Sequence, residues 1–163
     1  MKKNFSIIFL FLLLGCSDFD FVYNSSSDLK ELKEEVVVLV VGDDMELIKN
    51  YLLKKVGTGG ENPRYLLKIE SQKNIDASII NKDATASKFT IKHTLNYNFF
   101  NNDSGCLILN KVITTQSSYD AKSAGYSFGT DLSEKHTNSK DIESNIDKFI
   151  QEINSLQNNL SCK

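Results

Sequence analysis

One stretch of alternating residues constrains the fold more than any other feature of this sequence. Between residues 88 and 99, apolar or aromatic side chains alternate with polar ones, and a histidine takes one of the apolar places. Successive side chains of a β-strand point to opposite faces, so this pattern predicts a strand with one face on a core and the other on water or a polar partner. The first set is Phe89, Ile91, His93, Leu95, Tyr97 and Phe99, and the second is Lys88, Thr90, Lys92, Thr94, Asn96 and Asn98.

The first half of the chain predicts a strand followed by a helix. The continuous β-branched run at residues 36–41 is typical of a strand buried on both faces. Apolar residues then recur at helical spacing over 45–56, and Asp43 or Asp44 is placed to cap that helix. The glycines at 57–60 follow a helix rather than a strand, which favours a turn over a phosphate-binding loop.

The second half predicts three strands and a helix. A strand begins after Pro63, the alternating strand follows it, and a polar hairpin loop at 101–105 returns the chain into a strand at 106–115. Residues 117–138 show no firm periodicity, whereas an apolar stripe from about 139 to 156 predicts a long amphipathic helix. We therefore expect an α+β fold of order β-α-β-β-β-α: a two-layer sandwich with two helices packed on one face of a four-stranded mixed β-sheet.

The amino terminus predicts export. Two lysines precede an apolar run at residues 5–14, which is typical of a signal peptide and too short to span a membrane, since a spanning helix needs about 20 apolar residues. The sequence Leu13-Leu14-Gly15-Cys16 resembles the lipobox of bacterial lipoproteins, which implies cleavage before Cys16 and acylation of its thiol, with palmitate among the acyl chains. We expect a signal peptide at 1–15, a lipidated tether at 16–35 and one domain at 36–158. Ser17 is not the aspartate of an inner-membrane retention signal, which favours the periplasmic side of the outer membrane.

Charge and cysteine content bound the function further. Without Lys2 and Lys3, 17 of the 19 basic residues remain against 21 acidic ones, a formal charge of −4 that gives no general attraction to nucleic acid. Cys106 and Cys162 are a candidate disulfide in an oxidising compartment, and two unpaired cysteines are the alternative.

Nothing in the sequence predicts catalysis. His93 and His136 are the only histidines. His93 falls on the apolar face of its strand, where a hydrogen-bonded core histidine is the usual explanation. No residues near it have metal-ligand spacing, and no nucleophile with a base or paired carboxylates can be assembled. We therefore expect no enzyme, no metal and no cofactor.

Five local patterns follow one another along the chain: Phe21-Val22-Tyr23, Pro63-Arg64-Tyr65-Leu66-Leu67, the strand from Ser87 to Tyr97, Asp103-Ser104-Gly105 and Ser118-Tyr119-Asp120. Together with the lipobox and the order of the elements, they resemble the LptE family of lipoproteins, although the proline that is common in the family's aromatic start is missing here. The resemblance implies a structural partner of the LptD β-barrel in the outer membrane, which occupies the barrel lumen and binds lipopolysaccharide during its insertion into the outer leaflet.

The anionic headgroup of such a lipid needs cations. Lys88 and Lys92 share one face of the alternating strand, and Lys111 joins them from the next strand if the register permits. We take these three lysines as the expected lipopolysaccharide-binding patch, against the alternative of ordinary solvated lysines. A rival function is a stand-alone lipoprotein that binds a small ligand or peptide, or inhibits a periplasmic enzyme.

Overall fold

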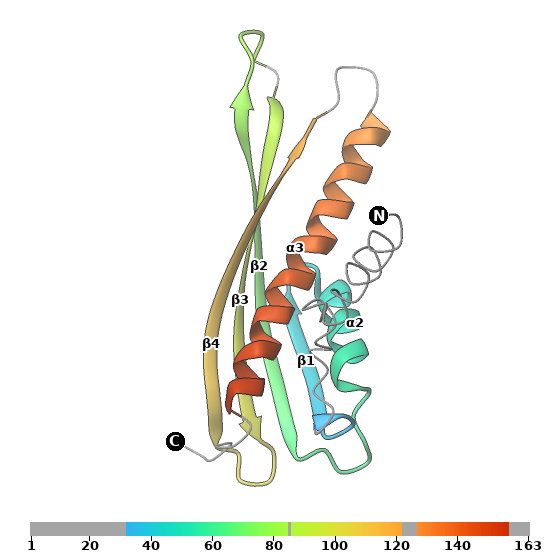
Figure 1. Ribbon diagram of the computed structural model, residues 1–163, viewed down its shortest axis with the longest axis vertical. Coiled ribbons are helices and arrows are strands. Elements are labelled where there is room, and N and C mark those ends of the chain that lie inside the picture. The colour runs from blue at the N-terminus through green and yellow to red at the C-terminus, as the bar shows by residue number, and fades with distance from the viewer. Residues whose placement is uncertain (1–31, 85, 122–126, 157–163) are drawn as a thin grey trace, which may run out of the picture.

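The computed structural model describes residues 32–84, 86–121 and 127–156, which form one layer of strands and one of helices (Figure 1). This confirms the predicted order β-α-β-β-β-α. None of the described helices is long and apolar enough to cross a membrane. The elements are β1 (Val36–Gly42), α2 (Met45–Val56), β2 (Tyr65–Ile80), β3 (Ala86–Asn101), β4 (Leu107–Asp120) and α3 (Ser127–Leu156).

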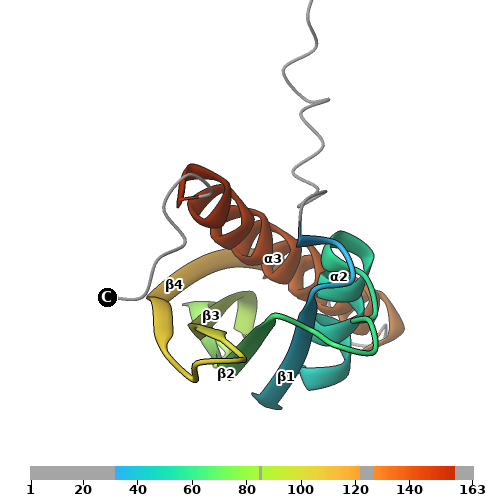
Figure 2. The ribbon, with the colours of Figure 1, turned by 90° about the horizontal axis from the view of Figure 1, so that it is seen from below.

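The four strands form one mixed sheet in the order β1-β2-β3-β4. β1 runs parallel to β2, and the other neighbours are antiparallel. Both helices lie on the same side of this sheet, as the view along it shows (Figure 2). The predicted two-layer sandwich is therefore confirmed, and neither of the described helices lies on the opposite side of the sheet.

The core lies between the helices and the sheet. The apolar face of β3 lies at its centre, where the ring of Tyr97 stacks on Phe149 of α3 with 4.0 Å between the ring centroids. Leu32 is also buried in this core, although the predicted domain boundaries placed it in the tether. The other large, fully buried side chains are Phe99, Ile48, Leu52, Leu67, Ile69, Ile91, Leu95, Ile142 and Ile146.

The prediction that the first strand is buried on both faces is wrong. Val36 and Val40 of β1 are buried beneath the helices, whereas Val37, Leu39 and Val41 are 39%, 48% and 41% exposed on the other side. An apolar run alone does not distinguish a strand that is covered on both faces from an edge strand that is covered on one face. β1 is at the border of the sheet, and only its helix side is covered.

Two elements extend beyond their predicted bounds. β4 continues to Asp120 and α3 begins at Ser127, so much of the segment predicted to be irregular is strand or helix. β2, for which only the start was predicted, continues to Ile80. The extensions are polar, and their regularity comes from backbone pairing: β2 and β3 stay paired from Tyr65 to Ile80. As a result the β2–β3 hairpin projects beyond β1 and α2 (Figure 1).

The turns around α2 are built differently from the prediction. Asp44 occupies the position before the helix with a positive φ of 52°, and its side chain makes no capping hydrogen bond. Gly42, with φ of 102°, ends β1 so close to β2 that an added Cβ would lie 2.1 Å from the Ser71 carbonyl oxygen. After the helix, the Gly57 N–H donates to the Leu53 carbonyl, which confirms that the glycine run is a turn.

Candidate functional site: the open face of the sheet

The uncovered side of the sheet, here called the open face, is largely polar and self-bonded. Its centre is the polar set of β3 together with the residues opposite it on β4. Thr94 and Thr114 share a hydroxyl hydrogen bond of 3.2 Å. The Asn110 amide donates to the side-chain oxygens of Asn96 and Asn98 at 3.1 and 2.7 Å. This confirms the predicted alternation of β3 and gives a flat, ordered surface of amide and hydroxyl groups.

Two of the three predicted lysines lie on the open face. Lys92 is exposed, opposite Gln116 of β4 and Asn74 of β2, and Lys88 is partly buried, opposite Asp120. Among the residues that the structure describes, neither amine is in an ion pair. Four residues along a strand span about 13 Å, so two lysines at this spacing can each meet a separate anionic group.

The third predicted lysine lies on the other side of the sheet. Lys111 is paired in register with Tyr97, whose ring is buried beneath α3, so its side chain belongs to the helix side. Its amine forms an ion pair of 2.6 Å with Glu152 of α3. The hypothesis that Lys111 joins Lys88 and Lys92 is therefore wrong, because side chains alternate along β4 and the register assigns residue 111 to the helix layer.

The formal charges of the open face balance. The described strands place three lysines and three carboxylates there, and Lys68 and Glu70 form an exposed ion pair of 3.3 Å. The lysines are therefore local binding points rather than a broad cationic surface. Beside β2, the exposed Val37, Leu39 and Val41 of β1 give this face an apolar margin. The charged residues are Lys68, Glu70, Asp76, Lys88, Lys92 and Asp120.

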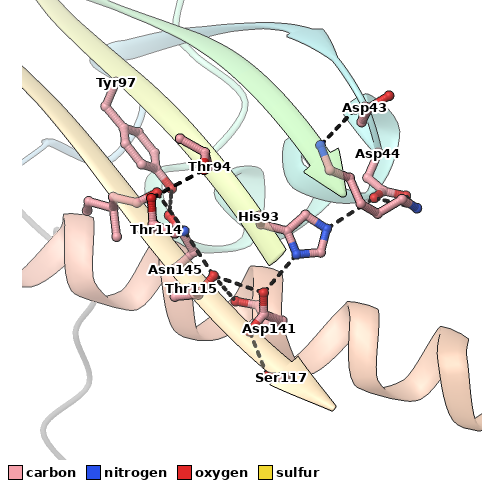
Figure 3. Close-up of polar contacts among 12 residues, drawn as sticks. Asp43, Asp44, His93, Thr94, Tyr97, Thr114, Thr115, Ser117, Asp141 and Asn145 are labelled. Carbon is pink, nitrogen blue, oxygen red and sulfur yellow. Dashed lines mark hydrogen bonds and ion pairs between the residues drawn. The ribbon is translucent and has the colours of Figure 1, made fainter. Parts of the chain in front are cut away.

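Beneath the open face, a buried polar network joins β3 to both helices (Figure 3). His93 is fully buried, with Nδ1 2.8 Å from Asp141 of α3 and Nε2 3.3 Å from Asp44 before α2. Thr115 and Ser117 of β4 donate to the same Asp141 carboxylate at 2.9 and 2.7 Å. Each oxygen of this carboxylate therefore has a donor, as a buried anion requires.

The chemistry of this network is structural. Both ring nitrogens of His93 are engaged by carboxylates, Nδ1 by Asp141 and Nε2 by Asp44. Burial raises the pKa of Asp44, but hydrogen bonds from Lys73 and His93 and the charge of Lys73 outweigh it and hold this pKa below its usual value. An imidazole with no exposed surface cannot reach a substrate. The core-histidine interpretation of His93 is confirmed.

Sequence reasoning missed most of this network. Asp141 and Asn145 lie one helical turn apart on α3, within the apolar stripe that contains Ile142 and Ile146. Asn145 accepts the Tyr97 hydroxyl at 2.9 Å and donates to Thr115 at 3.0 Å, which extends the network into the core. Two polar residues inside an apolar stripe, together with a histidine on the apolar face of a strand, were the available signal.

The remaining predicted sites lie largely outside the described residues. Cys16 and Cys162 are outside them. Cys106 is disulfide-bonded, but its partner is not among the described residues, so its pairing with Cys162 stays a prediction. No group of three His, Cys, Asp or Glu side chains in the described part of the chain is arranged to hold a metal ion.

Comparisons with known proteins rest on structure alone, since no protein-family model and no curated protein matches the sequence. A lipoprotein of Caulobacter crescentus superposes with a TM-score of 0.57 at 13% identity, covering 85% of this chain and 95% of that one. The rare lipoprotein B of Shewanella oneidensis gives 0.53 at 9% identity, covering 77% and 97%.

A minor lipoprotein of Acinetobacter baumannii gives a TM-score of 0.51 at 17% identity, covering 76% of this chain and 89% of that one. At these identities the similarity concerns the fold, and the high coverage of each neighbour means that almost its whole domain is matched. The described domain therefore has the two-layer fold found in these bacterial lipoproteins.

Proposed function

We propose that this protein is a lipid-anchored, non-catalytic lipoprotein of the outer membrane that assembles with an LptD-like β-barrel and binds lipopolysaccharide during its insertion. In this proposal the open face lies against the inner wall of the barrel. The observation that carries the proposal is the open face itself: a polar surface of three long strands that no other described element covers.

The lumen of an outer-membrane barrel is polar, whereas its lipid-facing side is apolar. A protein that fills the lumen therefore needs amide and hydroxyl groups rather than a hydrophobic patch. The Asn110, Asn96 and Asn98 amides and the Thr94–Thr114 pair provide this, and their mutual hydrogen bonds keep them ordered before a partner arrives. The three lysines and three carboxylates of the open face also suit a barrel wall that carries both positive and negative charges.

Lys88 and Lys92 supply the lipid-binding part of the proposal. Their spacing of about 13 Å suits a headgroup with two separated phosphates better than a single phosphate. Lys92 is exposed, and neither amine is in an ion pair within the described residues, so both are available to an anion. The Cys16 lipobox provides the membrane attachment, and acylation by two or three chains makes such attachment durable.

Two features support a non-catalytic lipoprotein role. His93 is enclosed by two carboxylates in the core. The solved neighbours include a rare lipoprotein B and a minor lipoprotein, and the same two-layer fold in this chain is consistent with a lipoprotein role.

The lipid-binding part is tested with purified lipopolysaccharide. The change Lys88→Glu with Lys92→Glu should weaken binding by at least about tenfold, since it replaces two attractive contacts with repulsive ones. The matched control is Lys49→Glu with Lys135→Glu, which makes the same charge change on exposed positions of α2 and α3. Equal losses of affinity in both variants would show that only the overall charge matters. No loss of affinity in either variant would refute the assignment of Lys88 and Lys92 to lipid binding.

The partner is tested by isolating the lipidated protein from its native membranes in mild detergent. The proposal predicts a β-barrel protein in stoichiometric amount. A stable monomer, together with unchanged surface lipopolysaccharide after depletion, would favour the stand-alone lipoprotein instead.

A further inference from the structure

A groove runs along the outer border of the sheet, between β4 and the second half of α3. Its volume is about 560 Å³. β4 is the last strand of the sheet and forms the floor of the groove, while one face of α3 forms its wall. The lining residues are Lys111, Val112, Ile113, Thr114, Lys148, Gln151, Glu152 and Ser155.

Among the described residues, part of the β4 backbone in this groove has hydrogen-bonding groups that no neighbouring strand uses. The Ala121 N–H donates to the Ser87 carbonyl, which fixes the phase of the β3–β4 ladder. Hydrogen-bonded and non-hydrogen-bonded pairs alternate in an antiparallel ladder, and the register is unbroken from residue 120 down to 109. Odd-numbered residues therefore bond to β3, whereas the N–H and C=O groups of Val112 and Thr114 point out of the sheet into the groove.

The wall of the groove is polar and cationic. Lys148, Gln151 and Ser155 are exposed along one face of α3. In the described residues the Lys148 amine and the Gln151 amide have no partner. The lining contains two ammonium groups, of Lys111 and Lys148, and one carboxylate, of Glu152, which is paired with Lys111.

We propose that this groove binds an extended, acidic polypeptide segment from another protein, which adds to β4 as a fifth strand. Its backbone pairs with the outward groups of Val112 and Thr114. Alternate side chains then point toward α3, where carboxylates meet Lys148 and Lys111. The intervening side chains of the added strand lie beside Val112, which is 55% exposed on the open face, so apolar residues suit these positions. This site is separate from Lys88 and Lys92 and does not depend on the proposed function.

The test uses two labelled peptides with the full mature protein in detergent. One alternates valine with glutamate over seven residues, and the other alternates valine with lysine. Fluorescence anisotropy at low salt should show the glutamate peptide binding at least about tenfold more tightly. Hydrogen exchange followed by NMR should show new protection at the Val112 and Thr114 amides, which exchange quickly in the free protein because they lie at an open edge.

Two substitutions separate strand addition from simple charge attraction. Val112→Pro removes an outward N–H that the β3–β4 ladder does not use, and an edge strand tolerates proline at such a position. This change should weaken peptide binding by about tenfold. The control Val112→Thr keeps the N–H and should keep the affinity. Lys148→Glu should also weaken binding, and Lys49→Glu should not.

Equal affinity for the two peptides would overturn the proposal, as would absence of binding at millimolar peptide or of protection at the two amides. A self-associated dimer protected at the same amides would also overturn it, because the edge would then pair with a second copy of this chain.

Discussion

The buried network predicts a large effect for one carboxylate. Asp141→Ala removes the acceptor of three donors: the His93 ring, the Thr115 hydroxyl and the Ser117 hydroxyl. Asp141 is only 3% exposed and His93 is fully buried, so water cannot replace the lost acceptor without opening the core. Leaving one buried donor without its acceptor costs about 1–3 kcal/mol, so three such donors together cost about 3 kcal/mol or more. We expect Asp141→Ala to destabilise the fold by that amount.

Urea unfolding of the mature chain with Cys16→Ser, followed by circular dichroism, measures this free energy. Replacing both partners together, His93→Leu with Asp141→Leu, should cost less than the sum of the single changes, since neither member of the pair is left without its hydrogen-bond partner. Thr94→Val on the open face is the control and should change stability by no more than about 0.5 kcal/mol. A loss below about 1 kcal/mol for Asp141→Ala, or additive losses in the pair, would refute the reasoning.

Three further predictions concern single positions. Gly42→Ala should destabilise the fold by about 2 kcal/mol or more, because the new Cβ meets the Ser71 carbonyl at a positive φ; thermal unfolding measures this. The pKa of Asp44 is lowered from 3.8 in the folded protein, so its carboxylate stabilises the fold above that pH, and this stabilisation is lost as the pH falls through the folded pKa. Asp44→Asn should therefore make the free energy of unfolding depend less on pH below about pH 4. Tyr97→Phe should cost about 1–3 kcal/mol in urea unfolding, because it leaves the buried Asn145 oxygen without its donor.

The layers of the fold could be predicted because its core strands and helices show clear periodicity. The alternation in β3 and the apolar stripe of α3 each depend on burial against one neighbour, and a regular pattern records that burial. The ends of β2 and β4 could not be predicted in the same way. Residues 71–80 are stabilised by backbone pairing with β3, which leaves no apolar pattern in the sequence.

The candidate site was predicted only in part, because register is a tertiary property. Lys88 and Lys92 share a strand, so alternation alone assigns them to one face. Lys111 is on another strand, and a shift of one residue in register would have reversed its side. The partners of His93 were hidden for a similar reason: Asp141 is 48 residues away, and only the packing of α3 brings it to the ring.

The central claim is that the open face meets the wall of a barrel, and site-specific cross-linking in native cells tests it most directly. A photo-reactive amino acid at Asn96 lies on the open face, and one at the exposed Lys49 of α2 lies on the helix layer. The account predicts that position 96 cross-links to a β-barrel protein and that position 49 does so weakly or not at all. Cross-links to the barrel from position 49 alone, or from neither position, would contradict it.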